Sequence, residues 1–122
     1  MNDLKNKSFA TRLKFALAGL VHAVGAERSV RTHLMFLAAV LAALAYLRPA
    51  PVWWALVLLI SSAVIAAELF NTAIERLADQ LQPKPDPQIR IIKDCAAAAV
   101  LVLSAGALCV AAALALSLWN AH

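Results

Sequence analysis

Long apolar stretches alternate with short polar segments along this chain. No Asp, Glu, Lys or Arg occurs in residues 34–47, 51–67 or 95–119. A helix needs about 20 mainly apolar residues to cross a hydrocarbon core of about 30 Å. We therefore predict an all-α integral membrane protein, with one domain over residues 1–122. Its three membrane-spanning helices are expected at 31–48, 51–79 and 93–119.

The segment at residues 8–26 has an amphipathic pattern instead. Ser8 is a typical N-cap residue, and the apolar side chains after it recur on one helical face. Arg12 and Lys14 flank that face, where long cationic side chains can reach lipid phosphates. We predict an N-terminal amphipathic helix lying on the membrane surface. Its apolar face comprises Phe9, Leu13, Ala16, Leu17, Leu20 and Val24.

Proline-containing segments separate the predicted spans. Arg48-Pro-Ala-Pro51 is expected to form a tight turn, followed by Trp53 and Trp54 at the membrane interface. Residues 80–88 contain three prolines and are predicted to be a loop.

Composition and charge agree with a membrane protein. Of 122 residues, 63% are hydrophobic and 15% charged, too apolar for a soluble domain of this size. Ten of the eleven basic residues precede the first span or lie between the second and third, and only Arg48 lies on the other side. The N-terminus and the 76–94 region are therefore predicted to be cytoplasmic and the C-terminus external. Because the charges follow the membrane boundary, the net charge of +4 does not indicate a nucleic-acid partner.

Five polar residues continue the second apolar stretch without a break: Glu68, Asn71, Thr72, Glu75 and Asp79. At about 100° per residue they share one stripe of a helix. Polar groups at membrane depth are costly. The stripe is therefore interpreted as the wall of a polar site at the membrane–cytoplasm boundary.

The charges near this boundary suit phosphate chemistry. Six of the seven acidic residues lie there with most of the cations. Carboxylates bind hard divalent cations, and Lys and Arg bind phosphate oxygens, as ATP with Mg²⁺ requires. The chain has no P-loop motif, and its three glycines are far apart. Composition alone leaves a proton- or cation-handling transporter equally open.

The segment Glu68-Leu-Phe-Asn71-Thr72-Ala73-Ile74-Glu75-x-x-x-Asp79 resembles the signature of the small integral-membrane diacylglycerol kinases of bacteria. Phe70 and Ala78 depart mildly from that pattern. Further matches are Ala18-Gly19-Leu20 with Glu27, then Arg31 and His33, and the pair Lys93-Asp94 before an alanine-rich span. The resemblance covers roughly residues 9–115.

This resemblance implies a homotrimer in the bacterial inner membrane with active sites shared between subunits. The implied reaction is ATP-dependent phosphorylation of the primary hydroxyl of 1,2-diacylglycerol to phosphatidic acid, with Mg²⁺ as cofactor. By motif position, Glu68 is the expected general base and Asn71 orients it or the phosphoryl group. Glu27 and Glu75 are expected to hold Mg²⁺ and nucleotide. The remaining assignments are Lys84, Pro85, Asp86, Lys93 and Asp94 to the nucleotide, and Arg31, His33 and Ala97, beside Glu68, to the lipid.

Alternatives stay open at this point. The position matching His33 is often acidic in members that act on diacylglycerol, so the form found here also resembles the branch that prefers undecaprenol. A small proton-coupled transporter and a structural membrane subunit are rivals of a different class. Individually, Glu68 and Glu75 suit helix–helix hydrogen bonds, and Glu27 suits an ion pair with Arg31 four residues on. Lys93-Asp94 also suits a helix-end anchor and cap.

Overall fold

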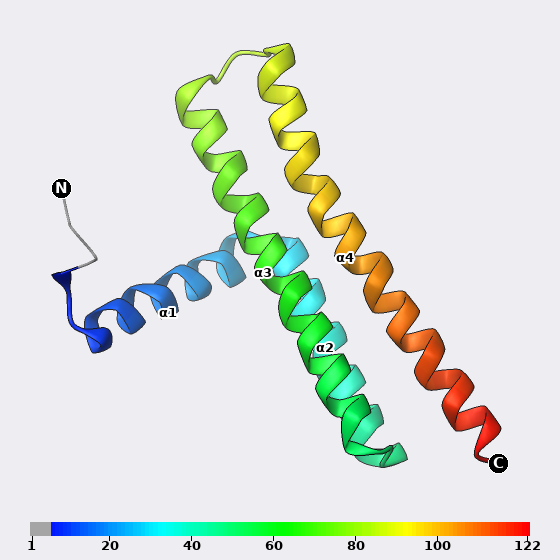
Figure 1. Cartoon of the computed structure of the whole chain (residues 1–122). Coiled ribbons are helices and arrows are strands. Elements are labelled where there is room, and N and C mark those ends of the chain that lie inside the picture. Colours follow the sequence, from blue (N-terminus) through cyan, green and yellow to red (C-terminus); the bar gives the residue numbers. More distant parts are fainter. Residues whose placement is uncertain (1–5) are drawn as a thin grey trace.

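The computed structural model describes residues 6–122, and this part of the chain folds into helices joined by short connections (Figure 1). The helices are α1 (Phe9–Ala26), α2 (Arg28–Leu47), α3 (Pro51–Leu81) and α4 (Pro87–Asn120), and the described residues contain no strand. α2, α3 and α4 are each long and apolar enough to cross a membrane. The all-α class is thus confirmed, together with three helices that are long and apolar enough to be the predicted spans.

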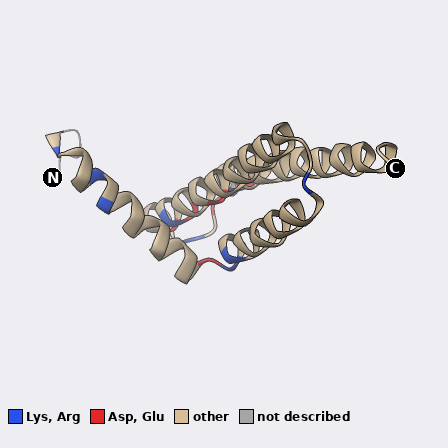
Figure 2. Cartoon of the chain, turned by 90° about the horizontal axis from the view of Figure 1, so that it is seen from below, with Lys and Arg blue, Asp and Glu red and all other residues tan. Residues whose placement is uncertain are grey.

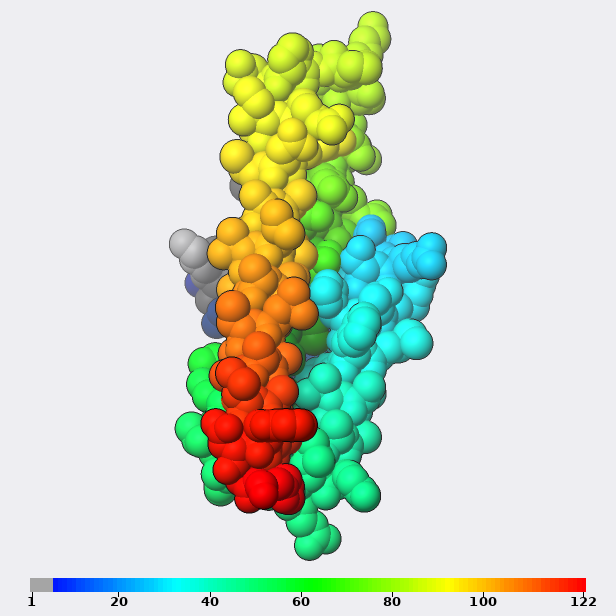
Figure 3. All heavy atoms as spheres, turned by 90° about the vertical axis from the view of Figure 1, so that its right-hand side faces the viewer, coloured from blue at the N-terminus to red at the C-terminus, as the bar shows by residue number. Residues whose placement is uncertain are grey.

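The three long helices run alternately up and down, while α1 leaves the bundle sideways from the start of α2 (Figure 1). α3 and α4 form a long hairpin that extends well past the start of α2 (Figure 1). Seen from the side of α4, that helix lies over α3, with α2 beside it (Figure 3). The molecule therefore has a three-helix part and a two-helix extension that carries the α3–α4 loop.

Local capping explains most helix ends. Ser8 caps α1, since its side-chain oxygen accepts a hydrogen bond from the Thr11 amide at 3.3 Å. Arg48 ends α2 in the left-handed conformation, with φ 50° and ψ 53°. Pro51 starts α3 at a first-turn position that needs no amide hydrogen.

The predicted loop at 80–88 is shorter than expected at both ends. α3 continues to Leu81, and α4 begins at Pro87 rather than near Lys93. Pro87 lies in the first turn, where its missing amide hydrogen costs nothing. Asp86 caps this turn, accepting hydrogen bonds from the Gln88 and Ile89 amides at 2.8 and 3.1 Å. Only two of the three prolines therefore interrupt helix. α2 likewise begins three residues before the predicted position 31, at Arg28.

Few residues are buried within this single chain. The buried apolar side chains are Ala23, Val30, Leu44, Val57, Val64, Ala67 and Ala78, and α4 contributes none. Phe9, Val21 and Leu17 of α1 are all more than half exposed. Charge is scarce along the apolar parts of the spans and lies on α1, near its junction with α2 and at the end of the molecule that carries the α3–α4 loop (Figure 2). So much uncovered apolar surface suits lipid or other copies of the chain as neighbours; the surface position of α1 and the homotrimer stay predictions.

Candidate functional site

The polar stripe of α3 forms a ladder that we call the α3 ladder: Glu68, Asn71, Thr72, Glu75 and Asp79. Glu68 and Thr72 are both buried, at 8% exposure. Glu75 is half-buried and Asp79 is exposed. The ladder therefore runs from the interior of the bundle towards the open α3–α4 extension, covering about 16 Å at 1.5 Å per residue.

Glu68, at the inner end of the ladder, is held by a residue of α2. His33 Nε2 lies 3.0 Å from Glu68 Oε1, within hydrogen-bond distance. The side chains are 28% and 10% exposed, respectively. Because water competes little at such burial, this contact fixes the carboxylate more firmly than a surface pair would.

The position of His33 along α2 also shows where Glu68 lies along the length of the three-helix part. His33 lies 5 residues after Arg28 and 14 before Leu47, which is about 7.5 and 21 Å along α2. The Glu68 carboxylate thus lies near one end of the three-helix part rather than at its middle. That end is where α1 joins α2 and where basic residues gather.

Asn71 and Glu75 form the middle of the ladder. The Asn71 side-chain amide donates to Glu75 Oε1 at 3.4 Å. Its other atom, Oδ1, is buried and has no hydrogen-bond partner among the described residues. A buried acceptor without a donor costs free energy, which points to a ligand or another chain as its missing partner.

Glu27, at the α1–α2 junction, forms an ion pair with Arg76, the residue that follows Glu75 of the ladder. Its Oε1 lies 3.5 Å from Arg76 Nη2, and both side chains are substantially exposed. Arg31 does not pair with Glu27 through its side chain. Instead its guanidinium donates to the Val24 and Gly25 carbonyls at 2.9 and 3.0 Å, closing the end of α1.

The outer end of the ladder contacts α4. Lys93 Nζ donates to Asp79 Oδ1 at 2.5 Å, and Arg90 pairs with Asp94 at 3.1 Å within the helix. Lys93 and Asp94 therefore lie in the second turn of α4, not at its end. The cap that the sequence allowed for them is made by Asp86. Lys84 and Pro85 are exposed in the loop.

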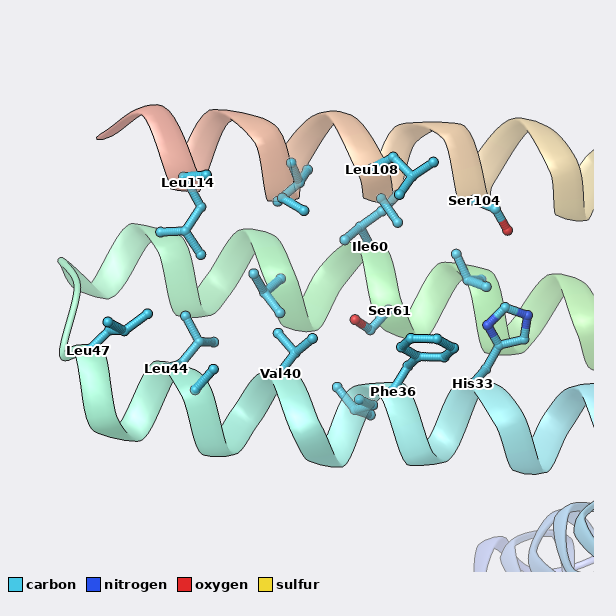
Figure 4. A pocket seen from close by; sticks show the side chains of 18 of the residues that line it. His33, Phe36, Val40, Leu44, Leu47, Ile60, Ser61, Ser104, Leu108 and Leu114 are labelled. Carbon is cyan, nitrogen blue, oxygen red and sulfur yellow. The ribbon is translucent and has the colours of Figure 1, made fainter. Parts of the chain in front are cut away.

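Two hollows adjoin the ladder. A groove of about 580 Å³ lies between α2, α3 and α4, and His33 lines it with residues that are almost all apolar (Figure 4). A smaller hollow of about 330 Å³ between α3 and α4 is lined by Asn71 and by apolar residues that include Ala96 and Ala99. Ala97 is exposed on α4 between these two alanines.

The structure thus brings some of the predicted site residues together and leaves others apart. Glu68 meets His33, Asn71 meets Glu75, and Glu27 reaches α3 at Arg76. Lys93 meets the ladder only at Asp79, one turn beyond Glu75. Ala97 and the loop residues Lys84 and Pro85 contact none of these groups through hydrogen bonds or ion pairs.

Arg76 had no assigned role in the sequence, and Asp79 had only its place on the polar stripe, yet both connect α3 to other elements. The signal for Asp79 was its spacing, four residues after Glu75. Its partner was hidden because the predicted loop placed Lys93 at a helix start. For Arg76 no signal was present, since it lies outside the motif positions.

Oxygen donors near Glu75 fit a magnesium ion. No group of three or more His, Cys, Asp or Glu side chains in residues 6–122 could hold a metal by itself. Mg²⁺, however, is usually bound by one or two carboxylates together with phosphate oxygens and water. Glu75 and the unpartnered Oδ1 of Asn71 meet that requirement, and Glu27 is held only by an exposed ion pair.

Three apolar helices with a ladder of carboxylates and an amide towards one end define a small helical membrane protein with a boundary site. The chain belongs to the prokaryotic diacylglycerol kinase family, whose family model matches residues 14–115. A relative named diacylglycerol kinase, from Synechocystis sp., is 34% identical over 98 residues, covering 80% of this chain and 56% of the relative. The chain therefore spans little more than half the length of that relative. No solved structure matches it.

Proposed function

We propose that this protein is an ATP-dependent lipid kinase that phosphorylates the primary hydroxyl of 1,2-diacylglycerol to give phosphatidic acid. The observation that carries the proposal is the α3 ladder, which puts a buried carboxylate, an amide and a second carboxylate on successive turns of one helix. Membership of the diacylglycerol kinase family and the name of the Synechocystis relative support the same reaction.

In the proposed reaction, Glu68 takes the proton of the lipid hydroxyl. The lipid oxygen bonds to the γ-phosphorus of ATP, the bond to the β,γ-bridging oxygen breaks, and ADP leaves. Because phosphoryl transfer depends mainly on positioning and charge neutralisation, the other residues bind and orient. Asn71 orients the reacting groups, and Glu27 and Glu75 hold Mg²⁺, which neutralises charge on the phosphates. Lys93 and Asp94 contact the nucleotide, Lys84 to Asp86 cover it, and Arg31, His33 and Ala97 border the lipid.

We further propose a homotrimer in the inner membrane with the ladder on the cytoplasmic side. The exposed apolar faces, above all that of α4, provide surface for other copies and for lipid. The distribution of basic residues supports the orientation.

Undecaprenol is a second candidate acceptor. The observation in its favour is His33, which occupies a position that is often acidic in members acting on diacylglycerol and which lies against Glu68. A proton-coupled transporter is less well supported, because such a protein needs its glutamate deep in a span. Glu68 instead contacts His33, which lies only about 7.5 Å along α2 from the start of that helix.

The test is phosphate transfer from ATP labelled in the γ-phosphate, by the purified protein in mixed micelles. Diacylglycerol and undecaprenol are offered separately, with Glu68→Gln as the control. We expect diacylglycerol to react faster, and Glu68→Gln to lower kcat by at least about 100-fold, the usual contribution of a general base. Faster transfer to undecaprenol supports the second candidate. No transfer to either lipid by folded, oligomeric protein, or full activity of Glu68→Gln, contradicts the kinase.

A further inference from the structure

The contact between His33 and Glu68 restrains only one oxygen of the carboxylate. Glu68 Oε1 lies 3.0 Å from His33 Nε2, whereas Oε2 has no hydrogen-bond partner among residues 6–122. An ionised carboxylate can only accept hydrogen bonds. A general base must be ionised, so in the proposed enzyme Nε2 carries the proton of this hydrogen bond, and Oε2 is the oxygen left for a ligand.

His33 lies where this pair meets the apolar groove. The groove runs along α2 from His33 to Leu47, and the imidazole ring lies at one end of it (Figure 4). A lipid alcohol with its apolar chain in this groove would place its hydroxyl at the His33 end. Glu68 does not line the groove itself, but its carboxylate contacts His33 at that end.

Glutamate has several side-chain torsions, and an unrestrained carboxylate would occupy many orientations. Fixing one oxygen removes most of this freedom. Reactions between oriented groups are sensitive to displacements of about 1 Å, which can change rates about 100-fold. The hydrogen bond from His33 therefore matters to the rate without touching the reacting atoms.

We propose that His33 is a positioning residue: its Nε2–H holds Oε1 of Glu68 and so presents Oε2 to the hydroxyl of the lipid acceptor. This inference rests on the proposed function, since it needs Glu68 as the base. It differs from the assignment of His33 to the lipid itself. A lipid contact acts on the KM for the lipid, whereas positioning of the base acts on kcat.

The kinetic test compares full-length His33→Leu, His33→Gln and His33→Asn, with the exposed His22→Leu as matched control. Initial rates are measured against ATP and each lipid. We expect His33→Leu to lower kcat about 100-fold while both KM values change less than about threefold. The Gln amide reaches the position of Nε2 and should recover kcat to within about tenfold of wild type, whereas the shorter Asn should not. His22→Leu should leave the rates unchanged.

Three results overturn the proposal: kcat of His33→Leu within twofold of wild type, a raised lipid KM at unchanged kcat, or Gln no better than Asn. The comparison of Gln with Asn keeps the test valid if His33→Leu does not fold, because both replacements are polar and differ by one methylene group.

A second measurement separates this proposal from the kinase activity. Ring ¹⁵N spectra of histidine-labelled protein are recorded for wild type and Glu68→Gln. We expect the His33 Nε2 signal to move and the His22 signals to stay. An unmoved His33 signal overturns the pair. A moved signal in a protein that phosphorylates neither lipid overturns the positioning role and the kinase together, while the contact itself stands.

Discussion

Asn71 carries a buried carbonyl oxygen that finds no donor among the described residues. Such an atom costs about 1–3 kcal/mol relative to a satisfied one. Proteins tolerate this cost mostly at sites where a ligand or partner completes the hydrogen bond. In the proposed enzyme, that partner is a group of the reacting complex.

Replacing Asn71 with Leu should therefore separate stability from activity. The side chains are similar in size, and Leu removes both the unpaired oxygen and the long hydrogen bond to Glu75, so the free energy of unfolding should change by less than about 1 kcal/mol. kcat should fall at least about 100-fold, because the orienting amide is lost. Thermal unfolding in detergent and the phosphate-transfer assay measure the two effects. Destabilisation by more than about 1 kcal/mol would mean that Asn71 mainly joins helices.

For single residues, the sequence predicted the helix face on which a side chain lies better than it predicted the residue that the side chain contacts. Helical periodicity alone places Glu68, Asn71 and Glu75 on one face of α3. The partner of Glu68 lies 35 residues away on another helix. That contact depends on the register of α2 against α3, which side-chain packing decides and single-chain periodicity does not contain. The hydrogen bonds of the Arg31 guanidinium could not be predicted for a related reason, since their acceptors are backbone carbonyls at the end of α1.

Among the elements, the α3–α4 hairpin decides which residues of the two helices meet. Because Pro87 follows two other prolines, the sequence predicts that it interrupts a helix. Proline is favourable at the first position of a helix, however, and Pro87 lies there in α4. The early start of α4 moves Lys93 into the helix, where it pairs with Asp79. The tight Arg48-Pro-Ala-Pro51 turn and the Ser8 cap were predictable because their signals are local.

Variants of the Asp79–Lys93 pair can distinguish a structural role of Lys93 from a role in nucleotide binding. Both side chains are partly exposed, so Asp79→Asn should destabilise by less than about 1 kcal/mol. It should leave the KM for ATP within about threefold. Lys93→Met should raise that KM about tenfold or more, because a charged hydrogen bond to phosphate is lost. Steady-state kinetics at varied ATP measure both. Equal effects of the two variants would make the pair purely structural.

On the scale of the whole molecule, most apolar side chains are uncovered, and α4 has no buried residue. The fold therefore depends on its surroundings for burial. Side-chain periodicity could not show this for α4, because a helix that is apolar all round has no preferred face. The number of spans was predictable from length and composition, whereas the partners of each face were not.

The orientation can be tested with one introduced cysteine at a time, in a background with Cys95→Ser and Cys109→Ser. Lys84→Cys lies in the α3–α4 loop and His122→Cys at the far end of α4, and both positions are exposed. In sealed vesicles, a membrane-impermeant maleimide should label Lys84→Cys only from the cytoplasmic side and His122→Cys only from the other. The reverse pattern would put the ladder outside, away from cellular ATP.

α3 is a single helix from Pro51 to Leu81, about 46 Å long at 1.5 Å per residue, and exceeds a hydrocarbon core of about 30 Å. The part of α3 that spans the membrane and the part that carries the α3 ladder belong to one continuous helix. A change in bilayer thickness that tilts α3 would move Glu68, Asn71, Glu75 and Asp79 together without altering their spacing. Membrane thickness would then set the depth at which the base meets the acceptor hydroxyl. The membrane itself would then tune the use of the lipid.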